Sequence, residues 1–327
     1  MKPRFILNSI LDSIGNTPLI RLKNTVREVE SAIFAKLEYF NPMGSIKDRI
    51  AKYMIEKAER DGRLRKGQTI VENSSGNTAL GLALVAIEKG YKLKVVVRDN
   101  TSEEKINRLK AMDVEIVKVD HTLPPKHPDS YNRITPRIVA QTPDSYFPDQ
   151  HNNLENNETH YLTTGPEIWE QMQGKIDYFV AGMGTGGTIG GVAQYLKEKD
   201  PSIQVIAIDP EGSIFYDHFY RNSPLKSHPF LLEGLGDEFL IKTADFSNID
   251  AIHRVNDRQA FLSTRRLVKE EGLMGGGSSG AALHVCLQLA RTLKQPRRIV
   301  TIFPDTASNY IKSIFNDRWM KKHGLLP

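Results

Sequence analysis

Apolar and polar positions alternate along this chain with two different periods. Short runs rich in valine and isoleucine predict β-strands, and runs with apolar residues every three or four positions predict α-helices. We expect strands at Thr69–Glu72, Leu93–Arg98, Val114–Val119, Tyr178–Ala181, Val205–Asp209 and Ile299–Phe303. We expect helices at Ala79–Lys89, Glu103–Met112, Ile189–Lys199, Gln259–Glu271 and Ala281–Leu293. Strands and helices that alternate along the sequence in this way predict an α/β fold with a mostly parallel sheet.

Two segments interrupt this alternation. His121–Arg137 is rich in proline and polar residues, and Tyr216–Leu231 has no clear period. We interpret both as long irregular loops. The run Asn316–Lys322 near the end of the chain predicts a short terminal helix.

Composition narrows the class of protein. The 327 residues suffice for one large or two ordinary domains, and 39% hydrophobic with 25% charged residues is typical of a globular protein. The apolar runs are too short for a membrane span, and the first residues lack a signal-peptide core, so we expect a cytoplasmic protein. The net charge of +5 is spread along the chain without a basic block, which argues against nucleic-acid binding. Cys286 is the single cysteine, which excludes an intrachain disulfide and a thiolate metal cluster, and we expect it to be a small core residue.

One lysine stands at a chemically unusual place. A strand-like run, Ala32–Phe40, leads into Asn41–Arg49, after which the pattern becomes helical. Ser45 as helix cap and Asp48 three residues later predict a capping box, which puts Lys47 in the first helical turn. The positive end of the helix dipole disfavours an ammonium group there, and a neutral amine suits Schiff-base chemistry. A surface lysine is the alternative, and this segment taken alone favours it.

The first of three loops between a strand and a helix is Glu72–Thr78, made of small polar residues. Its backbone N–H groups and hydroxyls at a helix start predict a site for a carboxylate or phosphate. A well-capped turn explains the same residues equally well.

The second and third loops are rich in glycine. Gly182–Gly191 gives the strongest phosphate signal of the chain, yet it fits neither a P-loop nor a clean dinucleotide fingerprint. Met274–Gly280 opens a helix, and Ser278 or Ser279 can present a hydroxyl to a ring atom, although a flexible helix start is an equal alternative. An amine, a phosphate loop and a serine together match three groups of pyridoxal 5'-phosphate, which are its aldehyde, its phosphate and its ring nitrogen.

With these motifs in this order, the chain resembles the cystathionine β-synthase and cysteine synthase family. The resemblance extends from Ile10–Leu19 to Asp317–Met320. It implies a fold-type-II pyridoxal-phosphate enzyme, similar to the tryptophan synthase β subunit, with two three-layer αβα domains and the cofactor between them. Residues 45–148 would form the smaller, mobile domain, and residues 1–44 and 149–327 the larger one. It also implies a homodimer that acts on small amino-acid substrates.

The resemblance assigns roles to individual residues. Lys47 resembles the Schiff-base lysine that also moves the substrate's α-proton, and Asn77 resembles the asparagine that bonds the cofactor's 3′-oxygen. The residues that would bind the substrate α-carboxylate are Ser74, Ser75, Gly76, Thr78 and Gln150. Those that match the phosphate loop are Gly184, Thr185, Gly186, Gly187 and Thr188. Ser278 matches the serine that faces the pyridine nitrogen. No metal is expected.

The implied activity is β-replacement on L-serine or an activated serine. The closest reading is cystathionine β-synthase, which joins serine and homocysteine. Cysteine synthase, which uses O-acetylserine and sulfide, is the alternative, as is a variant that releases hydrogen sulfide or forms diaminopropionate. A non-catalytic binding protein of the same fold would have lost Lys47 or the loops, and a nucleotide-dependent oxidoreductase would need the dinucleotide fingerprint.

Three residues depart from the family pattern. His151 stands where the family has tyrosine or phenylalanine, Asp237 where cystathionine β-synthases tend to have tyrosine, and Asn73 where a proline is usual. We hypothesise that His151 and Asp237 influence the choice of nucleophile, because a carboxylate near the entrance could repel sulfide or pair with an ammonium group. Drift at a tolerant loop is the alternative.

Overall fold

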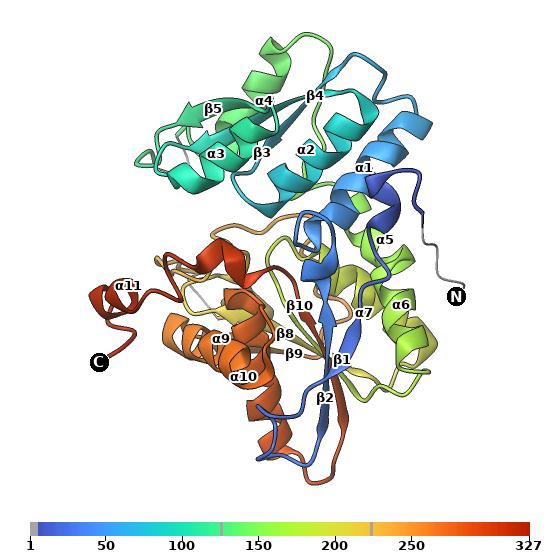
Figure 1. Cartoon of the computed structure of the whole chain (residues 1–327), viewed down its shortest axis with the longest axis vertical. Helices are drawn as coiled ribbons and strands as arrows, with labels where there is room; N and C mark the ends of the chain where they lie inside the picture. The colour runs from blue at the N-terminus through green and yellow to red at the C-terminus, as the bar shows by residue number, and fades with distance from the viewer. Residues whose placement is uncertain (1–5, 125–126, 223–224) are drawn as a thin grey trace. The chain divides into compact units, whose positions relative to one another are not determined.

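The chain is divided into two compact units, each made of two stretches of sequence. The computed structural model describes residues 6–124, 127–222 and 225–327. Unit 1 comprises Met1–Gly15 and Asn41–Glu155, and unit 2 comprises Asn16–Phe40 and Asn156–Pro327 (Figure 1). Each unit has its own sheet and its own buried core. The movement that we expect for residues 45–148 stays a prediction.

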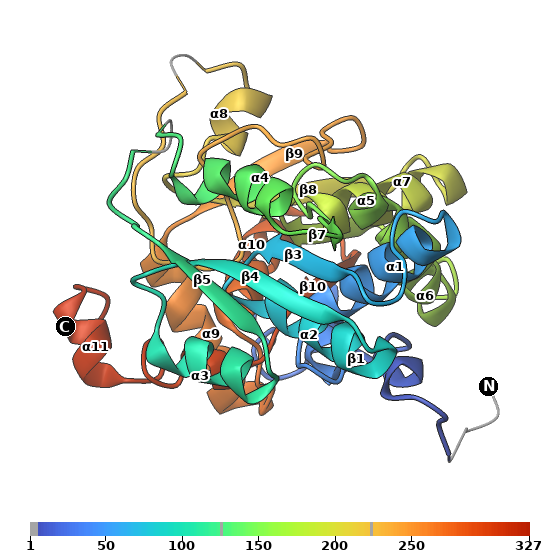
Figure 2. The same cartoon turned by 90° about the horizontal axis from the view of Figure 1, so that it is seen from above.

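Unit 1 is built around a four-stranded sheet in which all neighbours are parallel. Its order is β5-β4-β3-β6, with strands β3 (Thr69–Asn73), β4 (Lys92–Arg98), β5 (Glu115–Val119) and β6 (Ser145–Tyr146). Its helices are η1 (Ile10–Ser13), α1 (Lys47–Arg60), α2 (Asn77–Lys89), α3 (Glu103–Ala111) and α4 (Tyr131–Gln141). Helices α2 and α3 cover one face of the sheet and α4 covers the other (Figure 2). The predicted three-layer arrangement is thus confirmed for this unit.

Unit 2 contains a six-stranded sheet with the order β1-β2-β10-β7-β8-β9. Its strands are β1 (Leu19–Arg21), β2 (Ala32–Leu37), β7 (Tyr178–Gly182), β8 (Gln204–Pro210), β9 (Ala251–Val255) and β10 (Arg298–Phe303). Only the pairing of β1 with β2 is antiparallel among these neighbours. Parallel neighbours put the loops after β7, β8 and β10 at one edge of the sheet, where ligands bind in such folds.

The helices of unit 2 lie on both faces of its sheet. They are η2 (Glu38–Phe40), α5 (Glu155–Leu162), α6 (Thr164–Gln171), α7 (Gly187–Lys199), α8 (Phe215–Phe219), α9 (Asp257–Glu271), α10 (Gly277–Thr292), η3 (Ala307–Tyr310) and α11 (Asp317–Lys322). Helices α9 and α10 lie on one side, and α6 and α7 on the other (Figure 1). The apolar helix α10 carries Cys286, whose thiol is buried and has its pKa raised to about 12 by that burial. The prediction that this cysteine is a core residue is confirmed.

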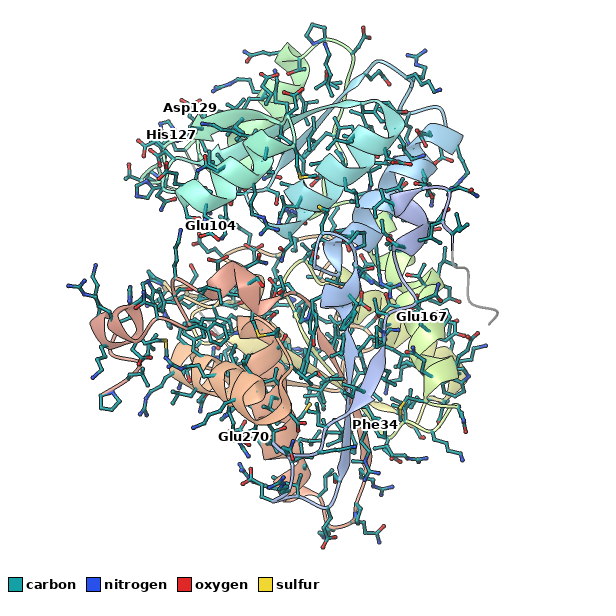
Figure 3. The ribbon with its side chains drawn as sticks, viewed as in Figure 1. Phe34, Glu104, His127, Asp129, Glu167 and Glu270 are labelled. Atoms are coloured by element: carbon teal, nitrogen blue, oxygen red, sulfur yellow. The ribbon has the colours of Figure 1, made fainter. Side chains whose placement is uncertain are left out.

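Strand β2 of the unit 2 sheet is connected to a helix by a buried ion pair. Lys36 on β2 is fully buried, and its Nζ lies 2.7 Å from a carboxylate oxygen of Glu167 on α6. Figure 3 labels Glu167 among the side chains of the molecule. The Lys36 nitrogen also donates to the carbonyl of Thr17 (2.7 Å) and to the side-chain oxygen of Gln171 (2.9 Å). A buried ammonium group is stable when such partners replace its water. This network ties β2 to α6.

Each strand and helix predicted from the hydrophobic pattern is present, with its ends within a few residues, but some neighbouring predictions are wrong. The strand predicted over Ala32–Phe40 ends at Leu37, and the last three residues form η2. The loop predicted over His121–Arg137 contains the start of α4, which packs on the sheet in spite of Pro136. The segment Tyr216–Leu231 begins inside α8 and is otherwise irregular.

Two of the segments interpreted as irregular loops lie partly outside the described residues. These residues are Pro125 and Lys126 in the segment His121–Arg137, and Ser223 and Pro224 in the segment Tyr216–Leu231.

The predicted terminal helix is confirmed as α11, where Asn316 caps the first turn by accepting the Trp319 N–H (3.1 Å). In the part of the chain that the structure describes, no helix combines the length and the apolar character that crossing a membrane requires.

Candidate active site

Lys47 is the first residue of α1, as predicted, but the capping box predicted around it is wrong. Ile46 occupies the cap position, and an isoleucine side chain cannot cap a helix. Ser45 Oγ accepts the Lys47 N–H (3.2 Å), and the buried Asp48 carboxylate accepts the N–H of Met43 (2.7 Å). Asp48 therefore stabilises the turn before the helix, and this turn determines that α1 begins at Lys47.

Lys47 is also positioned through the neighbouring helix. Gly81 on α2 faces the start of α1: a Cβ at Gly81 would lie 3.1 Å from the Lys47 carbonyl oxygen and 3.3 Å from Asp48 Cα. Only glycine lets the two helices approach so closely without displacement. The backbone of the lysine is thus held in register with the helix that the first polar loop opens.

The first polar loop joins β3 to α2 and carries the predicted carboxylate-binding residues. Gly76 occupies the cap position of α2, so the first-turn N–H groups receive no cap from that residue. The Gly76 N–H is itself directed to Ser74 Oγ (3.3 Å). Thr78 and Gln150 are buried, and the Thr78 hydroxyl donates to Gln150 Oε1 (2.6 Å). The structure thus brings Ser74, Thr78 and Gln150 to one end of α2, where an anion is favoured.

The second loop joins β7 to α7 and is packed tightly by its surroundings. Gly186, the cap residue of α7, has φ of +80°, and a Cβ there would lie 2.6 Å from Ala244 Cα. A side chain at Gly184 would collide with the Gly234 carbonyl, and one at Gly187 with the Asn156 amide. Because these positions admit no side chain, the loop presents backbone at the positive end of α7, which is the arrangement that binds phosphate.

Helix α5 supplies a row of buried side chains beneath this second loop, which the sequence analysis missed. Asn156 donates from Nδ2 to Thr185 Oγ1 (3.1 Å), and His160 Nε2 lies 3.2 Å from Thr188 Oγ1. Thr243 donates its hydroxyl to the Thr185 carbonyl (2.5 Å). Asn156 and His160 are four residues apart, so the sequence could have shown that they lie on one face of a helix. The spacing alone does not show that this face contacts the second loop.

The third loop opens α10 and places Ser278 in its first turn. The N–H of Gly276 donates to the carbonyl of Asp305 (2.9 Å), and a side chain at Gly276 would collide with Asp305 and Tyr310. The Tyr310 hydroxyl donates to Asp305 Oδ2 (2.8 Å). Ser278 is buried, and its contact with a ring nitrogen stays a prediction. Asp305 and Tyr310 were not predicted as parts of the site.

The two residues suspected of selecting the nucleophile lie in different units. His151 follows Gln150 in unit 1 and is half-buried. Asp237 belongs to unit 2, and its Oδ1 accepts the backbone N–H groups of Glu238 (2.7 Å) and Phe239 (3.3 Å). One function of the Asp237 carboxylate is therefore to fix the turn in which it stands.

One group of side chains has the spacing of a cation site. Ligand atoms of Asp99, Asp120 and His121 lie within 4.8 Å of one another, and all three residues are exposed. His121 Nδ1 is 2.7 Å from Asp99 Oδ1, so these two side chains satisfy each other. We assign no metal to this group, because exposed carboxylates gather in this way without one.

The donor set in the two units fits pyridoxal 5'-phosphate. Glycines 184, 186 and 187 form a cradle that an added Cβ would fill, which suits a phosphate. Lys47 offers an amine for an aldehyde, and Ser278 a hydroxyl for a ring nitrogen. The individual roles stay predictions, since they follow from the chemistry of the residues.

Comparison with known proteins places the chain in a family. The profile described as "Pyridoxal-phosphate dependent enzyme" matches residues 10–305. Cystathionine beta-synthase of Dictyostelium discoideum is 39% identical over 323 residues, which is 99% of this chain and 64% of that protein. Cysteine synthase of Staphylococcus aureus is 41% identical over 309 residues, covering 94% of this chain and 96% of that one.

A solved structure agrees with these relatives. The O-acetylserine dependent cystathionine beta-synthase of Helicobacter pylori aligns with a TM-score of 0.86 and 36% identity, over 95% of this chain and 99% of that chain. The chain thus spans less than two thirds of the Dictyostelium relative but nearly all of the bacterial ones. The resemblance and the fold class predicted from the sequence are confirmed. The chain belongs to the family of pyridoxal-phosphate dependent enzymes.

Proposed function

We propose that this protein replaces the β-substituent of L-serine or of an activated serine with a nucleophile. The observation that carries the proposal is the close crossing of α1 and α2 at Gly81. It holds the backbone of Lys47 in register with the loop Ser74–Thr78, so the lysine amine and the proposed carboxylate site belong to the same unit. An α-amino acid needs both, and its β-carbon then lies where a leaving group and a nucleophile can exchange.

The residues of the chain have separate tasks in this proposal. Ser74, Ser75, Thr78 and Gln150 bind the α-carboxylate with hydroxyl, amide and backbone donors. Pyridoxal phosphate, when bound, supplies the electron sink that makes the α-proton acidic. Lys47 would hold the cofactor through its amine, and Lys47 Nζ would take the proton from the substrate's Cα.

The remaining groups orient the cofactor. The Gly184–Thr188 loop binds the phosphate through backbone N–H groups, with Thr185 and Thr188 oriented by α5. Asn77 donates to the 3′-oxygen. Ser278 would offer a neutral hydroxyl to the ring nitrogen, and a neutral partner there would draw less charge into the ring than a carboxylate would. This favours loss of the β-substituent over transamination.

Our preferred assignment is cystathionine formation from serine and homocysteine. The Dictyostelium relative named as a cystathionine beta-synthase supports it. The Helicobacter pylori enzyme supports the same product, but its title names O-acetylserine as the donor. Cysteine synthesis from O-acetylserine and sulfide is the second candidate, and the near-complete coverage of the Staphylococcus cysteine synthase favours it. The two activities differ in leaving group and in nucleophile, and they require the same residues around the cofactor.

The test is to follow the cofactor absorption of the purified protein while L-serine or O-acetyl-L-serine is added. Each donor is then combined with homocysteine or sulfide, and the product is identified by mass spectrometry. Reaction of serine with homocysteine supports the preferred assignment, and reaction confined to O-acetylserine and sulfide supports the second. Cofactor binding without a response to either donor contradicts both and favours a binding protein.

We also propose that Asp237 and His151 influence which nucleophile reacts. The Asp237 carboxylate fixes the turn at residues 237–239 through two N–H groups, so its loss alters the shape of that loop. In Asp237→Tyr we expect the ratio of homocysteine to sulfide turnover to change at least about threefold. An unchanged ratio would contradict this idea.

We further propose that the protein is a homodimer and that residues 45–148 form a moving domain. Light scattering tests the homodimer, and X-ray scattering profiles with and without serine test the movement.

A further inference from the structure

Glu72 is an acidic residue in a strand whose other members are mostly buried. It is fully buried near the carboxyl end of β3, in the run Thr-Ile-Val-Glu-Asn. Moving a carboxylate out of water is costly unless hydrogen bonds or neutralisation compensate. A residue with this cost at the entrance to the first polar loop needs a structural reason.

The contacts of Glu72 supply that reason. Its Oε1 accepts the N–H of Asn73 (3.0 Å), at the start of the loop, and its Oε2 accepts the N–H of Gln150 (3.3 Å). Thr78, at the other end of the loop, donates to the side chain of Gln150 (2.6 Å). Gln150 is thus held at its backbone by Glu72 and at its amide by Thr78. One carboxyl group connects both parts of the predicted carboxylate site.

The sheet itself cannot make this connection. Strand β6 pairs with β3 only at Ser145 and Tyr146, opposite Thr69 and Ile70. The chain then passes Pro148, which has no N–H for a ladder bond, and turns at Asp149, whose φ is +53°. The backbone ladder therefore ends before Gln150. The Glu72 side chain bridges the gap that follows.

The charge state of Glu72 suits this place. Burial raises its pKa to about 8, the bond from the Asn73 N–H opposes the rise, and the charge of Asp149 adds to it. At neutral pH the group is then mostly uncharged. In this form the carbonyl oxygen accepts one hydrogen bond fully and the hydroxyl oxygen accepts the other more weakly, and no negative charge lies beside the loop that we propose to bind an anion.

We propose that Glu72 is a positioning residue that holds Gln150 against the loop Asn73–Thr78, so that both grip the α-carboxylate of the substrate. The inference rests on the proposed function for the identity of the ligand. Its structural part, the tether between the loop and Gln150, concerns the chain alone and is tested separately.

The test compares Glu72→Gln with Glu72→Asp and with the control Glu59→Gln. An amide has one acceptor oxygen, so Glu72→Gln keeps at most one of the two tethers, whereas aspartate keeps both acceptors on a shorter stem. Glu59 is a second carboxylate of unit 1, bonded to Lys89 and Tyr91 (2.8 Å each) and not to the loop. Thermal unfolding and bound cofactor are measured first for every variant.

The first readout is binding of the substrate carboxylate. In Glu72→Gln we expect the KM for the amino-acid donor to rise about tenfold, the effect of roughly one hydrogen bond, with kcat within about twofold. The affinity for the matching amine without a carboxylate should not change. Glu72→Asp should recover part of the loss, and Glu59→Gln should behave as the wild type. Equal losses for the amino acid and the amine would overturn the proposal.

The second readout does not depend on activity. Backbone hydrogen exchange in peptides covering residues 73–78 and 147–152 should become faster in Glu72→Gln and remain unchanged in Glu59→Gln. Unchanged exchange in both peptides would overturn the tether. If exchange changes while the wild type turns over neither donor, the proposed function fails and the tether stands.

Discussion

The loop at residues 74–78 and the loop at residues 184–188 have the same place in their units but different construction. Each follows a parallel strand and opens a helix whose cap residue is glycine. A Cβ at Gly187 would collide with Asn156, and one at Gly186 would lie 2.6 Å from Ala244 Cα. A Cβ at Gly76, in contrast, would have no described atom within 4 Å.

The second loop is therefore shaped by the exclusion of side chains, and the first by hydrogen bonds between side chains. Ser74, Thr78, Gln150 and Glu72 hold the first loop through bonds of 2.6–3.3 Å. Added atoms should damage the second loop, and removed polar atoms should damage the first. The difference also matches their proposed ligands, since a cofactor phosphate stays in place while a substrate must enter and leave.

The largest effect is expected from Gly187→Ala. Its methyl group would overlap the Asn156 amide, so the buried loop and α5 must move apart, at a cost of roughly 1–3 kcal/mol of unfolding free energy. We expect the purified variant to lose most of its bound pyridoxal phosphate, measured by absorbance. Adding Asn156→Ala should restore part of the stability by making room. A variant with normal cofactor content would contradict the steric account of this loop.

A smaller effect is expected from Thr78→Val, which removes a polar atom from the first loop and keeps its volume. Gln150 Oε1 then loses its donor, and the KM for the amino-acid donor should rise about tenfold, as for the loss of one buried hydrogen bond. Thr78→Ser retains the hydroxyl and should remain within about threefold of the wild type. Cofactor content should be normal in both variants. Loss of cofactor in Thr78→Val would erase the contrast between the loops.

Stability should also depend on pH through a buried carboxyl group of the first loop. The pKa of Glu72 is raised from the usual 4.5 to about 8, chiefly by burial. Between these values the folded protein keeps a proton that the unfolded chain has lost, so the free energy of unfolding falls as pH rises. Glu72→Gln lacks this titration. In urea unfolding, its free energy of unfolding relative to that of the wild type should therefore increase between about pH 5 and pH 8. A constant difference across this range would contradict the raised pKa.

The smallest effect is expected from Gly76→Ala. Its φ of −118° is accessible to alanine, and the methyl group would meet open space. Unfolding free energy should change by less than about 0.5 kcal/mol, and cofactor content should not change. Denaturant unfolding beside Gly187→Ala measures the contrast directly. Equal damage in the two variants would show that the loops are built alike.

Much of the fold follows from local sequence. The runs of valine and isoleucine in β4, β8 and β10 make the strands recognisable, because a strand buried on both faces needs no polar positions. Helix α4 was missed, since Pro136 is a strong local signal and only packing on the sheet outweighs it. The helix starts at Asn77 and Gly277 were placed too late, because polar and glycine residues in a first turn do not show the apolar period.

A candidate site could be proposed from the sequence where a residue type suggests a particular chemistry, as Lys47, Ser278 and the glycines do; their individual roles stay predictions. Its supporting side chains could not be proposed in this way. Asp48 was expected to cap α1 and instead bonds Met43, while Glu72 and His160 act through residues far along the chain. Such partners depend on the fold as a whole, and a single sequence gives no pairing for them.

Strand β10 lies between β2 and β7 in the larger sheet, although it comes near the end of the chain. During synthesis, β2 and β7 therefore leave the ribosome long before the strand that joins them. All residues of unit 1 are present once Glu155 has emerged, so that unit can fold while the other still has two open strand edges. Nascent chains that stall before Arg298 would expose these edges, and we expect them to be the forms that aggregate or recruit chaperones.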